Sequence, residues 1–490
     1  MISKTGLYMN VLSLTENKFA QVKFKMPAFF VWLFCGCSIA VHAQDSSNKI
    51  LSAEGFIAVV KQFHPVIKQA NISIEKAKAD IITARGGFDP SVYLNTDQKT
   101  FDGKNYYSHV NPELKIPTWY GIEVKAGLEN NGGQFLNSEI SSGQSSYVGI
   151  SVPLAKNLLM DKRRAVLQQA KIFRGQTEAE RENIINDLLY DAYSAYWNWV
   201  KEHQVYNIIS NTVKVNESRF ELVKIGFRQG DRPAIDTVEA LTQLQGFQYM
   251  QSESLVRLKN AALEVSNFLW LANNSYYQLA DDIQPDQQWN QQAVAVPVME
   301  ELLYNARLTH PKLKMFRYKF QWLEVERKLK FQSLLPTINV KANLLNKGYD
   351  VFNGIGKTGF YENNNKFGLD IGLPLRLSEG RGGYKAVKLK IQETNLELSL
   401  QQQAIENKIK LYYNELLGLQ QQVKIYDAAL RNYQTLFRGE EVKFRAGESS
   451  LFLLNSRENK QLEAQQKLVE LQTKYIKGLQ AVQWAAGQLR

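Results

Sequence analysis

The stretch FHPVIKQA at residues 63–70 has a counterpart, THPKLKMF, at residues 309–316. The two His-Pro pairs stand 246 residues apart, and so do Pro90 and Pro336, each 26 residues further on. Two more motifs recur in the same order: residues 152–154 (VPL) return at 373–375 (LPL), and 227–230 (FRQG) return at 444–447 (FRAG). Matching positions in one order indicate that a single structural unit was duplicated.

The N-terminus has the features of a targeting segment. Lys18, Lys23 and Lys25 precede an apolar stretch at residues 27–40, and Val41-His42-Ala43 offers small residues at a cleavage site. This pattern predicts a signal peptide over residues 1–43, although a lipoprotein would instead modify Cys35 or Cys37. Both cysteines fall in this segment, so the mature chain has no internal disulfide, which fits a bacterial envelope protein.

The chain is basic, but its charge pattern does not favour nucleic acid. Removing residues 1–43 takes away four lysines and one glutamate, which lowers the formal net charge from +11 to +8. Lys and Arg are spread through Gln- and Glu-rich stretches without a recognition motif. Clusters at 162–164 and 385–390 follow strand-like segments, where they would meet lipid headgroup phosphates or simply form solvated helix surface.

Two very long helices are predicted, one in each repeat. Residues 158–225 contain no proline and one glycine, and residues 384–446 contain no proline and two glycines. Apolar residues step by 3, 4 and 3 at 189–199 and again at 409–419. At a rise of 1.5 Å per residue, each helix would be about 95–100 Å long, which exceeds any globular core. Shorter helices are expected at 52–85 and 299–332, with breaks at the His-Pro pairs.

Strand-like segments lie between these helices. Apolar residues alternate with polar or small ones at 122–128, 148–152, 338–344 and 367–373. This alternation suits both a soluble sandwich and a barrel with lipid outside and water inside. From Pro90 to Pro153 there are 63 residues, against 38 from Pro336 to Pro374, so the first repeat carries 25 more. These residues are expected to form an extra hairpin or a long external loop.

Taken together, the signal peptide, the doubled order of elements and the Gly-centred hairpin tips resemble the TolC-type outer-membrane efflux family. The resemblance rests on the His-Pro segments and on residues 230–240 (GDRPAIDTVEA), and covers nearly all of the mature chain. It implies a mainly α protein with a membrane β-barrel, in which a homotrimer forms a 12-stranded barrel from four strands per protomer. The long helices would form a roughly 100 Å periplasmic tunnel.

We therefore expect three segments. They are the signal peptide (1–43), a first repeat (44–285; strands about 88–155, tip near 226–236) and a second repeat (286–490; strands about 336–377, tip near 444–453).

In the family, the hairpin tips meet a periplasmic adaptor and form the closable entrance. The resemblance places the adaptor-docking tips at Phe227, Arg228, Gly230, Asp231, Asp236, Phe444, Arg445, Gly447, Glu448, Ser449 and Ser450. The residues alone also suit plain helix capping: glycine permits a positive φ, and Asp231, Ser449 or Ser450 can cap the returning helix. Capping does not explain why Phe-Arg precedes both glycines, which favours docking.

The entrance departs from the pattern of some family members, which carry acidic residues six and nine positions after the second glycine. Here those positions are Leu453 and Ser456, whereas the first tip has Asp236 and Glu239. The candidate gate residues are therefore Phe452, Leu453, Asp236 and Glu239, and whether closure is ionic or apolar stays open.

No enzyme is predicted. The mature histidines lack a partner at metal-ligand spacing, so no metal or cofactor is expected. The leading hypothesis is a passive outer-membrane duct of a tripartite efflux or type I secretion system, extending into the periplasm, with an adaptor, an inner-membrane pump and outer-membrane lipid as partners. The alternative is a periplasmic coiled-coil scaffold or adaptor that does not enter the membrane.

Overall fold

The computed structural model describes residues 49–286, 296–349 and 364–490. The predicted signal peptide lies outside these residues. Within the described chain no helix combines the length and the apolar character needed to cross a membrane.

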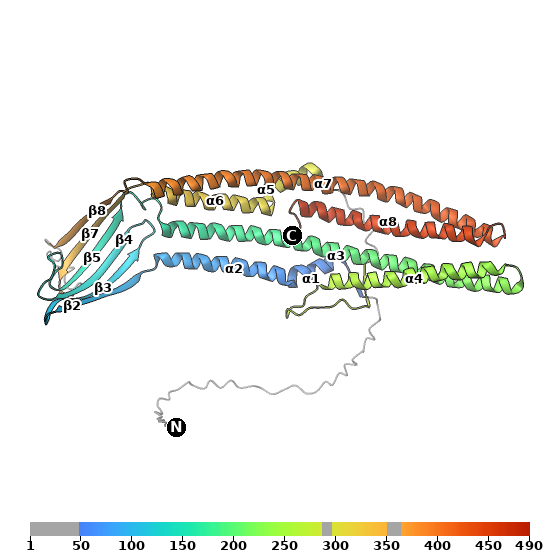
Figure 1. Cartoon of the computed structure of the whole chain (residues 1–490), viewed down its shortest axis with the longest axis horizontal. Helices are drawn as coiled ribbons and strands as arrows, with labels where there is room; N and C mark the ends of the chain where they lie inside the picture. The colour runs from blue at the N-terminus through green and yellow to red at the C-terminus, as the bar shows by residue number, and fades with distance from the viewer. Residues whose placement is uncertain (1–48, 287–295, 350–363) are drawn as a thin grey trace, which may run out of the picture. The chain divides into compact units, whose positions relative to one another are not determined.

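Elements follow the same order in both repeats: a split helix, strands, a long helix and a returning helix (Figure 1). The first repeat contains β1 (Lys49–Leu51), α1 (Ala53–Phe63), α2 (Pro65–Arg85), a 3-10 turn (Gly86–Phe88), β2 (Ser91–Phe101), β3 (Lys104–Pro117), β4 (Glu123–Gly132), β5 (Gly143–Pro153), α3 (Lys162–Gln229), α4 (Ala234–Ser266) and β6 (Ile283–Pro285). The second contains α5 (Met299–Thr309), α6 (Pro311–Gln332), β7 (Thr337–Lys347), β8 (Asn365–Gly372), α7 (Ser378–Arg445) and α8 (Leu451–Ala485).

Each His-Pro pair divides a helix, as predicted. His64 ends α1 and caps α2, and its Nδ1 accepts a hydrogen bond from the Val66 amide at 3.3 Å. His310 does the same between α5 and α6, accepting from the Lys312 amide at 3.2 Å. Proline fits the first helical position because its missing N–H would have no partner there.

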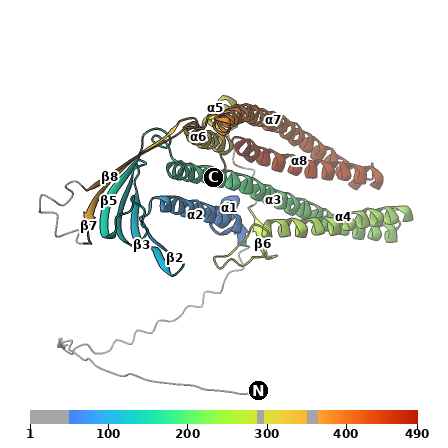
Figure 2. The ribbon, with the colours of Figure 1, turned by 60° about the vertical axis from the view of Figure 1, so that its left-hand side comes forward.

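The long helices are also as predicted: α3 and α7 are each 68 residues, or about 100 Å. In the described chain the helices form a layer: α2 and α4 lie along one side of α3, α6 and α8 lie along its other side, and α7 lies beyond these two (Figure 2). One apolar cluster surrounds Tyr196 and Trp199 of α3, and another joins α7 to α8 around Ile409 and Leu416.

Six strands form one antiparallel sheet, in the order β2-β3-β4-β5-β7-β8, and β1 and β6 pair separately in parallel. The sheet thus has two strands more than the four that each protomer was expected to give to the barrel. The 25 extra residues account for the difference, because β3 and β4 form a full hairpin between β2 and β5 instead of an external loop. The two repeats meet where β5 pairs with β7.

The register places most apolar residues of the six strands on one face of the sheet. Val92 lies opposite Leu114, Leu114 opposite Ala126, and Ala126 opposite Val148. The row continues from Val148 to Leu344. The opposite face carries mostly charged and polar residues, including Glu113, Lys125, Lys341 and Asp370, of which the last two form an ion pair at 2.6 Å.

Candidate functional site: the hairpin tips

Both hairpins turn on a glycine with a left-handed backbone. Gly230 has φ +85° and Gly447 has φ +78°. At the first tip the Asp231 amide donates to the Gly226 carbonyl at 2.9 Å, and at the second the Glu448 amide donates to the Lys443 carbonyl at 2.9 Å. The predicted positive φ is confirmed at both tips, and the same turn closes both long helices.

The returning helices begin differently. Ser450 caps α8, because its hydroxyl accepts from the Leu453 amide at 3.4 Å, as predicted. Asp231 does not cap α4: the capping position is Pro233, which has no side-chain bond to the helix. Ser449 instead donates to Glu440 on α7.

The Phe-Arg pairs differ in exposure. Phe227 is 45% exposed and Arg228 is exposed, whereas Phe444 is 8% exposed and packs with Val223 and Leu451. Phe444 is also covered by Arg232, whose guanidinium lies 4.0 Å from its ring centroid. The first tip therefore packs directly on the second.

The candidate gate residues separate into two kinds. Asp236 forms an ion pair with Arg232 at 3.4 Å, and Glu239 accepts from the Asn455 side chain of α8 at 3.1 Å. Phe452 and Leu453 have no such partner among the described contacts and are 68% and 44% exposed. Within one copy Glu239 joins the two hairpins and Asp236 pairs within the first, whereas the apolar pair is exposed.

A buried polar cluster joins the two hairpins close to the tips, and the sequence did not predict it. Arg219 of α3 donates two hydrogen bonds to Glu458 of α8, at 2.5 and 3.1 Å, and Asn216 donates to the same carboxylate at 3.1 Å. Gln243 of α4 adds a bond of 2.8 Å to Asn459. No spacing rule finds this cluster, because its members lie about 240 residues apart and meet only through helix packing.

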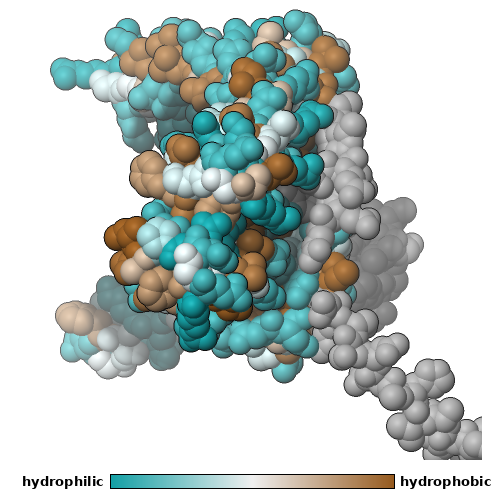
Figure 3. All heavy atoms as spheres, turned by 90° about the vertical axis from the view of Figure 1, so that its right-hand side faces the viewer, coloured by the Kyte–Doolittle hydropathy of each residue, from teal (hydrophilic) through white to brown (hydrophobic). Residues whose placement is uncertain are grey.

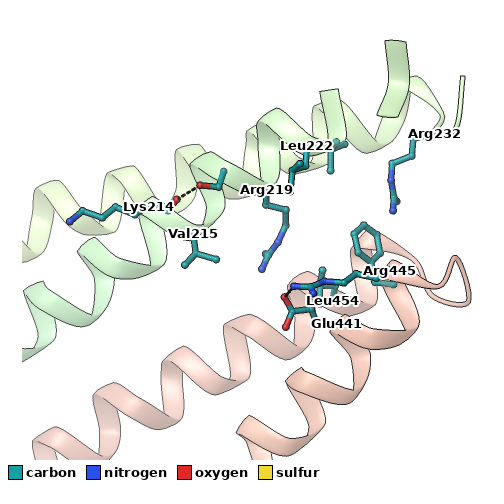
Figure 4. Close-up of a pocket in the computed structure, with 11 residues that line it drawn as sticks. Lys214, Val215, Arg219, Leu222, Arg232, Glu441, Arg445 and Leu454 are labelled. Atoms are coloured by element: carbon teal, nitrogen blue, oxygen red, sulfur yellow. Dashed lines mark hydrogen bonds and ion pairs between the residues drawn. The ribbon is translucent and has the colours of Figure 1, made fainter. Parts of the chain in front are cut away.

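A groove of about 610 Å³ opens between the hairpins beside this cluster (Figure 4). Arg219, Arg232 and Arg445 line it together with Glu441, and Arg445 pairs with Glu441 at 2.7 Å. Apolar walls come from α3, α7 and α8: Val215, Leu222, Val223, Phe444 and Leu454. Figure 3 views this end of the molecule, where apolar patches lie among hydrophilic ones.

His64 and His310 have the same structural role in the two repeats. Burial lowers the pKa of His310 to about 4, with Lys312 and Lys408 adding to the effect, and its ring also bonds the backbone of Ala485 at the end of α8. Burial lowers the pKa of His64 too, and its ring bonds the backbone of Asn267 at the end of α4. Each histidine thus ties a split helix to the end of its own hairpin. Among the described residues no group of acidic, His or Cys side chains has metal-site geometry.

Comparison with known proteins agrees with this geometry. Residues 302–488 match the family described as "Outer membrane efflux protein". A comparison with curated proteins gave no match.

Solved structures similar to this one are outer-membrane channels. The channel OprN matches with a TM-score of 0.64 and 12% identity, over 89% of this chain and 90% of that one. The Campylobacter jejuni channel CmeC matches with a TM-score of 0.61 and 13% identity, over 89% and 86%. The open Neisseria gonorrhoeae channel MtrE matches with a TM-score of 0.61 and 14% identity, over 89% of each chain.

The resemblance found in the sequence is confirmed: residues 302–488 match the family described as "Outer membrane efflux protein", and the described chain has the TolC-like fold of the outer-membrane channels.

Proposed function

We propose that three copies of the chain form the passive exit duct of a tripartite efflux or type I secretion system. An inner-membrane pump supplies the energy, and a periplasmic adaptor docks on the hairpin tips. Small molecules or proteins then pass to the outside without any chemical step on the duct.

The observation that carries this proposal is the six-stranded sheet, which has a free edge on each side and one largely apolar face. Open strand edges in lipid leave backbone groups unpaired, so one copy cannot insert alone. Val92 on β2 is 76% exposed, and Phe367 and Ile371 on β8 are 69% and 68% exposed. Such a patch is unfavourable in water and favourable against lipid. If the chain were a periplasmic scaffold, nothing would cover this apolar face.

The tips support adaptor docking. Phe227, Arg228 and Asp231 are exposed at the first tip, and Arg445 and Glu448 at the second. No atom lies within 4 Å of a Cβ built on Gly230 or Gly447, so the protomer itself leaves space there. The groove beside Arg219 and Arg445 could receive one helical hairpin of an adaptor.

The test compares two substitutions at each glycine. Gly230→Trp and Gly447→Trp add bulk where only a partner would come, whereas Gly230→Ala and Gly447→Ala introduce the same backbone strain with little bulk. We expect the Trp variants to form normal trimers in the outer membrane but to lose export, with the Ala variants close to wild type. Normal export by both Trp variants would disprove docking at the tips.

A further inference from the structure

The inference concerns the hairpin formed by β3 and β4, which has no counterpart among the described residues of the second repeat. After Pro336 the chain runs through β7 and, beyond residues 350–363, through β8 to the next long helix; after Pro90 it runs through four strands. The added hairpin has two possible places: in the membrane wall, or as a flap lying off it. The structure favours the first.

Pairing is continuous through the hairpin. β2 pairs with β3 along its whole length, and β4 pairs with β5 from Glu123 to Asn131, so β2 has no direct contact with β5 as a neighbouring strand. Removing β3 and β4 from the wall would break both ladders. Unpaired strand edges inside a bilayer are costly, because no water is there to satisfy them.

The apolar face is continuous as well. A shallow groove of about 250 Å³ crosses four successive strands of the sheet. Most of its lining is apolar (Val92, Pro112, Leu114, Ala126, Leu128 and Val148), and Glu113, Gly127 and Tyr147 complete it. The added hairpin thus offers lipid the same surface as the strands on either side of it. A flap in water would gain nothing from this pattern.

The opposite face is tied together through the hairpin. Tyr147 of β5 donates to Glu113 of β3 at 2.5 Å, and the Lys115 ammonium lies 5.0 Å from the Tyr93 ring of β2. Ser145 donates to Glu129 of β4 at 3.2 Å. Gly127 and Gly149 are buried on this face, while Val148 and Ile150 on the apolar face are exposed, as in a sheet curled with its polar side inward.

The width of the sheet fits the helices beneath it. Tilted strands take up about 6 Å of circumference each, so six span about 37 Å and four span about 25 Å. The helical layer is four rods wide, and rods packed 8–10 Å apart span about 32–40 Å. Six tilted strands are therefore about as wide as the four rods beneath them.

We propose that all six strands stand in the membrane wall, so that three copies close an 18-stranded barrel in place of the expected 12. This rests on the trimer of the proposed function. An even number of strands per copy leaves β8 antiparallel to β2 of the next copy, so every edge finds a partner. Because barrel diameter grows with strand number, the bore is about half as wide again, and the outer-membrane end admits correspondingly bulkier hydrophilic cargo.

The test uses single cysteines carrying a fluorophore in trimers reconstituted with brominated lipid, which quenches only dyes that touch acyl chains. Leu114→Cys and Ala126→Cys report on the hairpin. Val148→Cys reports on β5, which lies in the membrane wall in either arrangement, and Lys125→Cys reports on the polar face. We expect Leu114 and Ala126 to be quenched as strongly as Val148, and Lys125 to be quenched little.

Quenching at Val148 without quenching at Leu114 or Ala126 would overturn the proposal and leave the channel function intact. Absence of quenching at all four positions would show that the sheet is not in the bilayer, so the proposed function would fail first. Electron microscopy of the same trimers counts the strands directly: 18 supports the proposal and 12 refutes it.

Discussion

At the scale of single residues, the buried histidine at the second helix break makes the fold sensitive to pH. His310 has a pKa of about 4 in the folded chain, against 6.5 for an ordinary histidine, chiefly because it is buried. Between pH 6.5 and 4 the unfolded chain therefore binds a proton that the folded chain does not. Stability falls as the pH is lowered through this window, by up to about 3 kcal/mol.

We expect His310→Asn to flatten this dependence, since Asn also caps helices but does not titrate. The measurement is thermal unfolding of the detergent-solubilised protein at pH 4.5 and pH 7.5. The variant should lose less stability than wild type between these two values. An undiminished pH effect in the variant would assign it to other groups.

The second prediction at this scale is that the ion pair Arg219–Glu458 holds the two hairpins together near their tips. Its side chains are 12% and 9% exposed, and removing one partner leaves a buried charge, which costs about 3–5 kcal/mol. Arg219→Ala should therefore loosen the two hairpins and raise the single-channel conductance of the closed protein in planar bilayers. Lys460→Ala, which breaks the exposed pair Lys460–Glu463, is the control and should change nothing. If Arg219→Ala and Lys460→Ala gave the same conductance, the ion pair Arg219–Glu458 would not be what keeps the hairpins closed.

At the scale of elements, one close contact fixes α3 against α6. A Cβ built on Gly175 would lie 2.6 Å from the Tyr318 ring, so a larger residue must displace the ring or the helix. Gly175→Ala should destabilise the protein by about 1–3 kcal/mol through overpacking. Gly246→Ala in α4, where nothing lies within 4 Å, should instead stabilise it by about 0.5–1 kcal/mol. Thermal unfolding compares the two, and the same sign in both would refute the packing argument.

The helices and strands differ in how well they could be predicted from the sequence. The long helices and the breaks at His64 and His310 were predictable, because proline-free stretches and His-Pro pairs act locally. The strand number was not, since a 25-residue excess fits a loop as well as a hairpin, and only the pairing of β3 and β4 decides between them. Burial of Phe444 was also hidden, because Arg232 covers it from the other tip.

At the scale of the whole molecule, the layer of helices ends in two apolar surfaces that its own residues do not cover. Exposed residues on α7 stand 7, 4, 11, 14 and 11 apart, so they share one face of the helix: Leu389, Leu396, Leu400, Leu411, Ile425 and Leu436. On the opposite side of the layer, α4 exposes a similar row: Val238, Tyr249, Val256 and Leu263. These two rows are where adjacent copies would pack.

This arrangement leads to the last prediction. Leu396 and Leu400 are 68% and 69% exposed in a single copy, and trimer formation would bury them against the adjacent copy. Leu396→Glu with Leu400→Glu should therefore abolish the detergent-resistant trimer, because a buried unpaired carboxylate costs several kcal/mol. Ser399→Glu adds a charge to the same exposed turn but away from the apolar row, and should assemble normally. Native electrophoresis and light scattering give the oligomeric state. If the double variant stayed trimeric, this face of α7 would have to point to solvent or lumen, and copies would have to meet elsewhere on the helical layer.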